Sequence, residues 1–144
     1  MLSNKLLNLL IKKKITFFSG VPDSVLSDFI KGIEKKRDLK HIISSNEGTA
    51  VSTAIGHYLA TKTIPCVYLQ NSGLGNAINP LISIAHEKVY SIPLGLIIGW
   101  RGSPKVKDEP QHNVKGKITE QILKLLNIKY TIVRSDKDLK ALLS

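Results

Sequence analysis

The sequence predicts an α/β fold in which a doubly wound, mostly parallel sheet is flanked by helices. Helical and strand-like hydrophobic patterns alternate along the chain, and segments of helical length separate each strand from the next. Crossovers of that length join parallel strands. The nearly continuous apolar stretch over residues 92–100 is typical of a central strand that is covered on both faces. The 144 residues therefore predict a single domain over residues 1–144.

The chain begins with a predicted helix and strand. Leucines at helical spacing predict a helix over residues 2–13, and β-branched and aromatic residues predict a strand over residues 15–19. A turn of Gly, Pro, Asp and Ser follows. In it, Asp23 or Ser24 is expected to cap a helix over residues 25–33.

The same alternation continues to the end of the chain. A strand is expected over residues 41–44, and Ser45 or Asn46 is expected to cap the helix that runs on to Leu59. The later segments are, in order, a strand at 65–69, a loop at 71–76, a helix at 77–86, a strand at 92–100, a polar loop at 101–115, a helix at 117–126, a strand at 130–133 and a helical turn from Asp136.

Composition indicates a globular protein rather than a membrane or secreted one. Hydrophobic residues make up 42% and charged residues 22%, and no apolar run approaches the roughly 20 residues of a membrane span. Lysines 12–14 follow the first apolar residues, which is the reverse of the charge order in a secretory signal. The single cysteine, Cys66, lies in an apolar stretch, so we expect a core thiol in a protein of the reducing cytoplasm.

The net charge of +10 raises the alternative of nucleic-acid binding. The lysines are scattered, however, and no basic stripe is interleaved with aromatic residues. A positive field suits a small anionic substrate equally well. We therefore expect neither a nucleic-acid nor a membrane partner.

Four loops hold most of the residues that can carry chemistry. In doubly wound sheets, ligands bind outside the carboxyl ends of the strands. That rule selects the loops at residues 20–24, 44–48, 70–76 and 100–112.

Individual motifs in these loops are open to two interpretations. Glu47 stands in the first turn of a helix, where a carboxylate is also favoured by the helix dipole alone. Gly73-x-Gly75 begins like a dinucleotide fingerprint but lacks its third glycine, so a strand-to-helix turn is the simpler interpretation. The run from Asp108 to His112 is either an exposed loop or an acid–base set at the predicted site.

Taken together and in order, four segments resemble the pyrimidine-binding domain of phosphonopyruvate decarboxylases and, less closely, the alpha subunit of sulfopyruvate decarboxylases. The segments are FFSGVPDS at 17–24, HIISSNEG at 41–48, PCVYLQNSGLGNAINPL at 65–81 and SIPLGLIIGWRGSPKVKDEPQH at 91–112. The likeness covers the chain from Leu6 to about Val133.

The resemblance implies a thiamine-diphosphate-dependent carboxy-lyase and assigns roles to residues. Glu47 matches the glutamate that activates the cofactor, and Asp23 and His112 match active-site acid–base residues that also face the substrate. Relatives often carry a histidine pair where Gln111 precedes His112. The loop expected to flank the cofactor comprises Gln70, Asn71, Ser72 and Gly73. The cations expected to attract an anionic 2-oxo acid are Arg101 and, less specifically, Lys105 and Lys107.

The family's second domain, which binds the diphosphate through Mg²⁺, has no counterpart in this sequence. The Gly-Asp-Gly start of that domain is missing, so a partner subunit, or another part of a longer protein, is expected to supply it. A homo- or hetero-oligomer is therefore expected. The segment GWRGSPKVKDEPQH at 99–112 favours the phosphonopyruvate enzyme, which forms phosphonoacetaldehyde and CO2. The alternatives are a sulfopyruvate decarboxylase alpha subunit and a non-catalytic, partner-binding remnant of such a domain.

Overall fold

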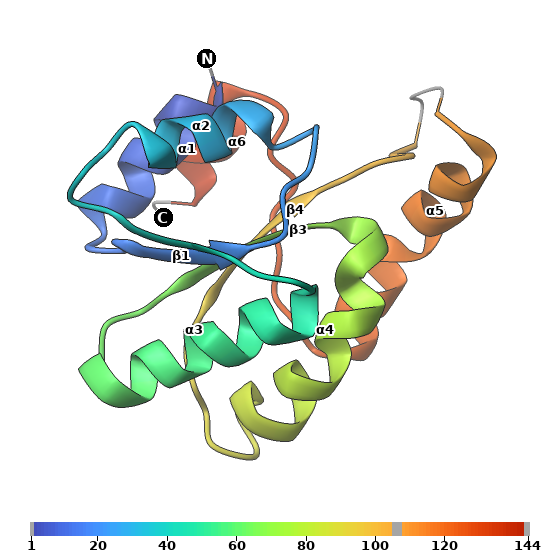
Figure 1. The fold of residues 1–144 in the computed structure, drawn as a ribbon. Helices are drawn as coiled ribbons and strands as arrows, with labels where there is room; N and C mark the ends of the chain where they lie inside the picture. The colour runs from blue at the N-terminus through green and yellow to red at the C-terminus, as the bar shows by residue number, and fades with distance from the viewer. Residues whose placement is uncertain (1, 105–107, 143–144) are drawn as a thin grey trace.

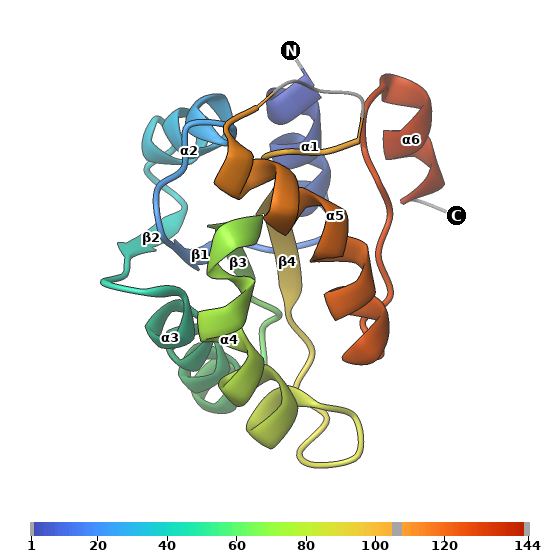
Figure 2. The same cartoon turned by 90° about the vertical axis from the view of Figure 1, so that its right-hand side faces the viewer.

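A four-stranded, all-parallel sheet forms the centre of the computed structural model, which describes residues 2–104 and 108–142. Its strands are β1 (Phe17–Gly20), β2 (Lys40–Ile43), β3 (Cys66–Gln70) and β4 (Gly95–Gly99), arranged in the order β2-β1-β3-β4 (Figures 1 and 2). In register, Phe18 lies beside His41 on one side and Cys66 on the other. The predicted α/β class and parallel sheet are confirmed.

Helices cover both faces of this sheet. One face carries α1 (Leu2–Lys12), α2 (Ser27–Glu34) and α6 (Asp136–Ala141) (Figures 1 and 2). The other carries α3 (Glu47–Thr61) and α4 (Leu74–Pro80), and α5 (Pro110–Leu125) lies beside α4. A short 3₁₀ turn (Asn71–Gly73) precedes α4, and a π-helical turn (Leu81–Ala85) follows it.

The side chains of β3 alternate between two hydrophobic cores. Val67 and Leu69 pack on the α3 and α4 side, whereas Cys66 and Tyr68 pack on the α1 and α2 side. All four are completely buried, as a central strand with helices on both faces requires. Cys66 is thus a free core thiol, as expected.

Three local predictions were wrong. Neither Asp23 nor Ser24 caps α2 through its side chain: backbone turns lead into that helix, and the Asp23 carboxylate points elsewhere. The polar loop ends earlier than expected, because Pro110 occupies the first position of α5, where its fixed φ and missing N–H suit a helix start.

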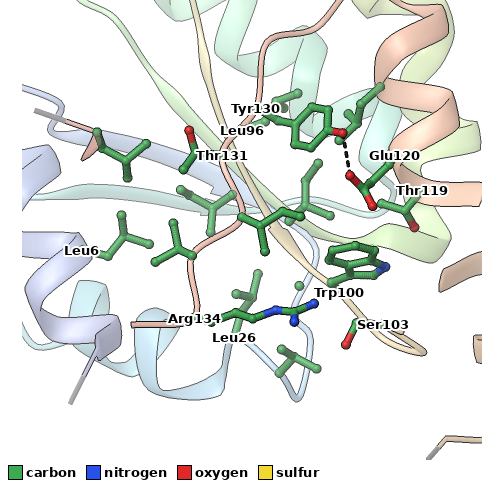
Figure 3. A pocket seen from close by; sticks show the side chains of 18 of the residues that line it. Leu6, Leu26, Leu96, Trp100, Ser103, Thr119, Glu120, Tyr130, Thr131 and Arg134 are labelled. Carbon is green, nitrogen blue, oxygen red and sulfur yellow. Dashed lines mark hydrogen bonds between the residues drawn. The ribbon is translucent and has the colours of Figure 1, made fainter. Parts of the chain in front are cut away.

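The third wrong prediction is the strand at residues 130–133, which forms no ladder with β4. The Tyr130 hydroxyl donates to Glu120 on α5, and Ser135 caps α6, so both ends of this segment are held by helices. A mainly apolar cavity of about 660 Å³ lies between the segment and β4 (Figure 3). At its rim, the Arg134 guanidinium lies 5.9 Å from the ring centre of Trp100.

In the part of the chain that the structure describes, no helix is both long and apolar enough to span a membrane.

Candidate active site

The four predicted loops meet at one edge of the sheet because all four strands are parallel. Hydrogen bonds donated by side chains join them directly. Gln70 at the end of β3 donates to the Asp23 carboxylate after β1, and the Asn71 side chain donates to the backbone carbonyl of Arg101 after β4. The parallel topology therefore brings together residues that lie far apart in the sequence.

Glu47 is the first residue of α3 and lies half-buried at this edge. The preceding Asn46 caps the helix, since its side-chain oxygen accepts a hydrogen bond from the Thr49 amide at 2.9 Å. Asn76 Nδ2 donates to Glu47 Oε2 at 2.8 Å. Among the described residues, the other carboxylate oxygen, Oε1, has no hydrogen-bond partner, so it remains available to a ligand.

Gly73 provides the surface against which the Glu47 side chain lies. A Cβ atom at position 73 would overlap the Glu47 carboxyl group. Gly73 has a φ of −85° and a ψ of −4°, which any residue adopts, so space rather than backbone freedom requires glycine there. The first glycine of the Gly73-x-Gly75 pattern is therefore explained by room for Glu47, whereas the contacts of Gly75 do not require glycine.

Asp23 is buried and forms a second polar group with Gln70 and Ser72. Gln70 Nε2 donates to Asp23 Oδ1 at 2.7 Å, and Ser72 Oγ donates to Gln70 Oε1 at 2.6 Å. Asp23 Oδ2 packs against Gly99 and has no partner within the described ranges. Burying a carboxylate oxygen without a hydrogen-bond donor costs free energy. Such an oxygen therefore indicates a position where a ligand or a proton is needed.

Asn71, expected beside the cofactor, has its side chain turned into the protein. Its Nδ2 donates to the Arg101 carbonyl at 3.0 Å and to Thr119 Oγ1 at 2.9 Å, while its Oδ1 accepts from the Arg101 amide at 3.1 Å. The side chain thus joins β3, β4 and α5. Only the backbone of Asn71 is left to face a ligand.

Arg101 is held in a bidentate ion pair. Its Nε and Nη2 each lie 2.8 Å from the Asp108 carboxylate, and Nη1 donates to Ser24 Oγ at 3.1 Å. The hydrogen bond to Asp108 raises the pKa of Arg101, and the same contact holds the pKa of Asp108 well below its usual range. Both groups stay charged at neutral pH.

His112 lies in the first turn of α5 rather than on a loop. Its backbone carbonyl packs against Gly102, and its ring Nδ1 is buried without a partner among the described residues. The structure thus places His112 at the end of β4, on the same edge as Arg101. Lys105 and Lys107 lie outside the described residues.

The sequence assigned no role to Asn76, considered Ser24 only as a helix cap, and considered Asp108 only within the possible acid–base set of residues 108–112. Asn76 lies in the predicted loop, but nothing in its spacing indicates that it reaches back to Glu47 on α3. Asp108 could have been paired with Arg101 from the opposite charges within one loop. In the described ranges, no three His, Cys, Asp or Glu side chains are grouped as metal ligands would be.

An all-parallel sheet with anchored carboxylates at its carboxyl edge is typical of α/β domains, and such domains generally bind their ligands at that edge. The chain belongs to the family described as thiamine pyrophosphate enzyme, N-terminal TPP binding domain, whose model matches residues 2–124. That family was expected from the four ordered segments and is confirmed.

Curated relatives include both kinds of decarboxylase. Phosphonopyruvate decarboxylase of Streptomyces viridochromogenes is 36% identical over 124 residues, which is 86% of this chain but 30% of that protein. Sulfopyruvate decarboxylase subunit alpha of Methanocaldococcus jannaschii is 34% identical over 121 residues, or 84% of this chain and 69% of that subunit. The chain thus spans about a third of the phosphonopyruvate decarboxylases that it matches.

Among solved structures, the thiamine diphosphate-dependent 4-hydroxybenzoylformate decarboxylase of Rhodococcus jostii RHA1 matches with a TM-score of 0.60 and 30% identity. The match covers 70% of this chain and 18% of that one. The matched share is again one domain of a much longer protein.

Proposed function

We propose that this chain is the pyrimidine-binding part of a thiamine-diphosphate-dependent 2-oxo acid decarboxylase that converts phosphonopyruvate to phosphonoacetaldehyde and CO2. The observation that carries the proposal is the half-buried Glu47 carboxylate at this edge, of which one oxygen accepts from Asn76 and the other has no hydrogen-bond partner within residues 2–104 and 108–142. Family membership and the phosphonopyruvate decarboxylase relatives support it.

The residues at this edge fit the pyrimidine ring of thiamine diphosphate. Glu47 Oε1 is the acceptor for the proton at the ring nitrogen N1′, and Gly73 leaves the space in which that carboxyl group lies. We assign the backbone of residues 70–73 and the Ser72 hydroxyl to the same ring. When bound, the cofactor accepts the electron pair that departing CO2 leaves behind.

Three further side chains are assigned to the substrate. Asp23 has a buried carboxylate oxygen, and His112 a buried ring nitrogen, without a partner among the described residues, and we assign both side chains to hold or move a proton on the reacting side. Arg101 is assigned to the anionic tail of the substrate, since a guanidinium binds phosphonate or sulfonate oxygens in pairs.

The diphosphate and its Mg²⁺ are assigned to a second domain or subunit that packs over the carboxyl edge of the sheet. The alpha-subunit relative, named as one subunit of its enzyme, supports a partner of this kind. The complete enzyme is then an oligomer.

The experiment starts with the complex of this chain and the diphosphate-binding protein that copurifies with it from its native host. Glu47→Gln keeps the shape of the side chain but removes its acid–base function. We expect decarboxylation to fall about 10²–10⁴-fold. Glu34→Gln, a carboxylate change on α2 away from this edge, is the matched control and is expected to leave the rate unchanged.

A fully active Glu47→Gln complex would contradict the role given to Glu47. A wild-type complex that decarboxylates no 2-oxo acid, although thiamine diphosphate and Mg²⁺ are supplied, would instead favour a non-catalytic partner-binding domain.

Sulfopyruvate is the second candidate substrate, because the chain matches 69% of the length of a sulfopyruvate decarboxylase alpha subunit. Comparing kcat/KM for the two substrates on the wild-type complex decides between them. A larger value for sulfopyruvate would replace the phosphonopyruvate assignment.

A further inference from the structure

Asp108 makes most of the polar contacts around Arg101. Its carboxylate accepts hydrogen bonds from Arg101 Nε and Nη2, from the Gly102 amide at 3.0 Å and from the Glu109 amide at 2.9 Å. The Asp108 side chain is only 11% exposed. A carboxylate that accepts four hydrogen bonds in this way has little freedom to rotate.

The same residue ties Arg101 to the start of α5. The Asp108 carbonyl accepts from Asn113 Nδ2 at 2.9 Å, and Glu109, which follows Asp108, is the N-cap of α5. Gly102, at a φ of +62°, packs on the carbonyl of His112. Asp108 therefore fixes Arg101 relative to the helix that carries His112.

The contacts leave the guanidinium with a defined free end. A guanidinium carries N–H donors on Nε and two on each terminal nitrogen. Among the described residues, Asp108 uses Nε and one N–H of Nη2, and Ser24 uses one N–H of Nη1. One N–H on each terminal nitrogen remains, and these two donors are available to the oxygens of a phosphonate, sulfonate or carboxylate group.

We infer that Asp108 is a positioning residue: together with Ser24 it aims Arg101, so that the two remaining N–H groups form a preset fork for the anionic tail of the substrate. This inference rests on the proposed function. Asp108 also neutralises most of the charge of Arg101, so the fork selects by geometry more than by long-range attraction.

The test is a double-mutant cycle on the complex used above, with KM and kcat measured separately. Asp108→Asn is expected to raise KM for phosphonopyruvate about tenfold and to change kcat less than about twofold, because Arg101 acts in binding rather than in the chemical step. Arg101→Ala is expected to raise KM at least as much. The double variant should then show no further rise in KM over Arg101→Ala, because in this inference Asp108 affects substrate binding through Arg101.

Glu109→Gln is the matched control. It removes the same charge from the neighbouring residue, whose side chain is exposed, and leaves the ion pair intact. We expect its KM to equal that of the wild type, and Asp108→Glu to recover part of the affinity lost in Asp108→Asn. These results would support the inference.

Three results would overturn it. The first is an unchanged KM in Asp108→Asn. The second is that adding Asp108→Asn to Arg101→Ala raises KM by the same factor as adding it to the wild type. The third is a fall in kcat and thermal stability at constant KM. In each case the wild-type complex is active, so the proposed function survives. An inactive wild-type complex would reject the proposed function itself, and the inference with it.

Discussion

Gly73 and Glu47 lie so close together that any side chain at position 73 would displace the Glu47 carboxyl group. The two residues come from different elements, the turn after β3 and the first turn of α3. Because of this contact, position 73 must be glycine for the Glu47 carboxyl group to keep its place.

We therefore predict that Gly73→Ala removes most of the decarboxylase activity. Its backbone angles are open to alanine, so the loss would come from the shifted Glu47 carboxylate and approach the ~10²–10⁴-fold of a lost acid–base group. Gly75→Ala is the control, since a Cβ there meets nothing within 4 Å. Steady-state rates together with thermal melting check this; equal activity in the two variants would contradict it.

Asn71 is predicted to contribute to stability rather than to bind the cofactor through its side chain. Asn71→Ala leaves the Arg101 amide and carbonyl without partners, at an expected loss of about 2–3 kcal/mol in the free energy of unfolding. Urea unfolding measures the change. Asn79→Ala, at an exposed position on α4, should stay within about 0.5 kcal/mol of the wild type. A loss no larger than in Asn79→Ala would argue against the role of Asn71.

Gly116 on α5 touches Gly102 in the loop after β4. A Cβ at position 116 would overlap the Gly102 carbonyl, so Gly116→Ala is expected to destabilise the fold by about 1–3 kcal/mol. Gly56→Ala on α3 has open space and is expected to stabilise the fold by about 0.5–1 kcal/mol. A lower urea midpoint in Gly116→Ala and a higher one in Gly56→Ala would confirm both predictions. An unchanged midpoint in Gly116→Ala would show that α5 can move away at no cost.

Cys66 is predicted to be inert in the folded protein. Burial raises the pKa of its thiol to about 12, so the reactive thiolate is essentially absent at pH 8. Because the pKa is higher in the folded state, this thiol favours unfolding only as pH rises above its ordinary pKa of 9.0 toward 12. Labelling with a thiol reagent at pH 8 should be complete in urea and negligible in buffer. Rapid labelling of the native chain would refute the prediction.

Much of the fold was predictable because hydrophobic spacing reports burial directly. The near-continuous apolar residues of β3 and β4 predict strands, and Asn46 predicts the start of α3 through its capping side chain. The segment at residues 130–133 has the same β-branched composition, yet it is anchored by Tyr130 and Ser135 to helices instead of to β4. Composition predicts a strand only where a neighbouring strand is also within hydrogen-bonding reach.

The sequence predicted where the site lies in the fold better than it predicted which side chains contact one another there. Parallel topology alone brings the loops of Asp23, Glu47 and Gln70 to one edge. The direction of each side chain depends on tertiary packing, which turned Asn71 inward. Asn76 reaches back to Glu47 from another helix, and no spacing rule encodes such a contact.

The outer side of β2 has a practical consequence for anyone who purifies this chain. Within the described ranges β2 ends the sheet and Lys40, Ile42 and Ile43 on it are exposed, so its free backbone groups offer a template on which another copy could add a strand. The surplus of ten positive charges keeps copies apart by mutual repulsion. High salt screens that repulsion, so dilute buffers of low ionic strength are the conditions that favour a monodisperse sample.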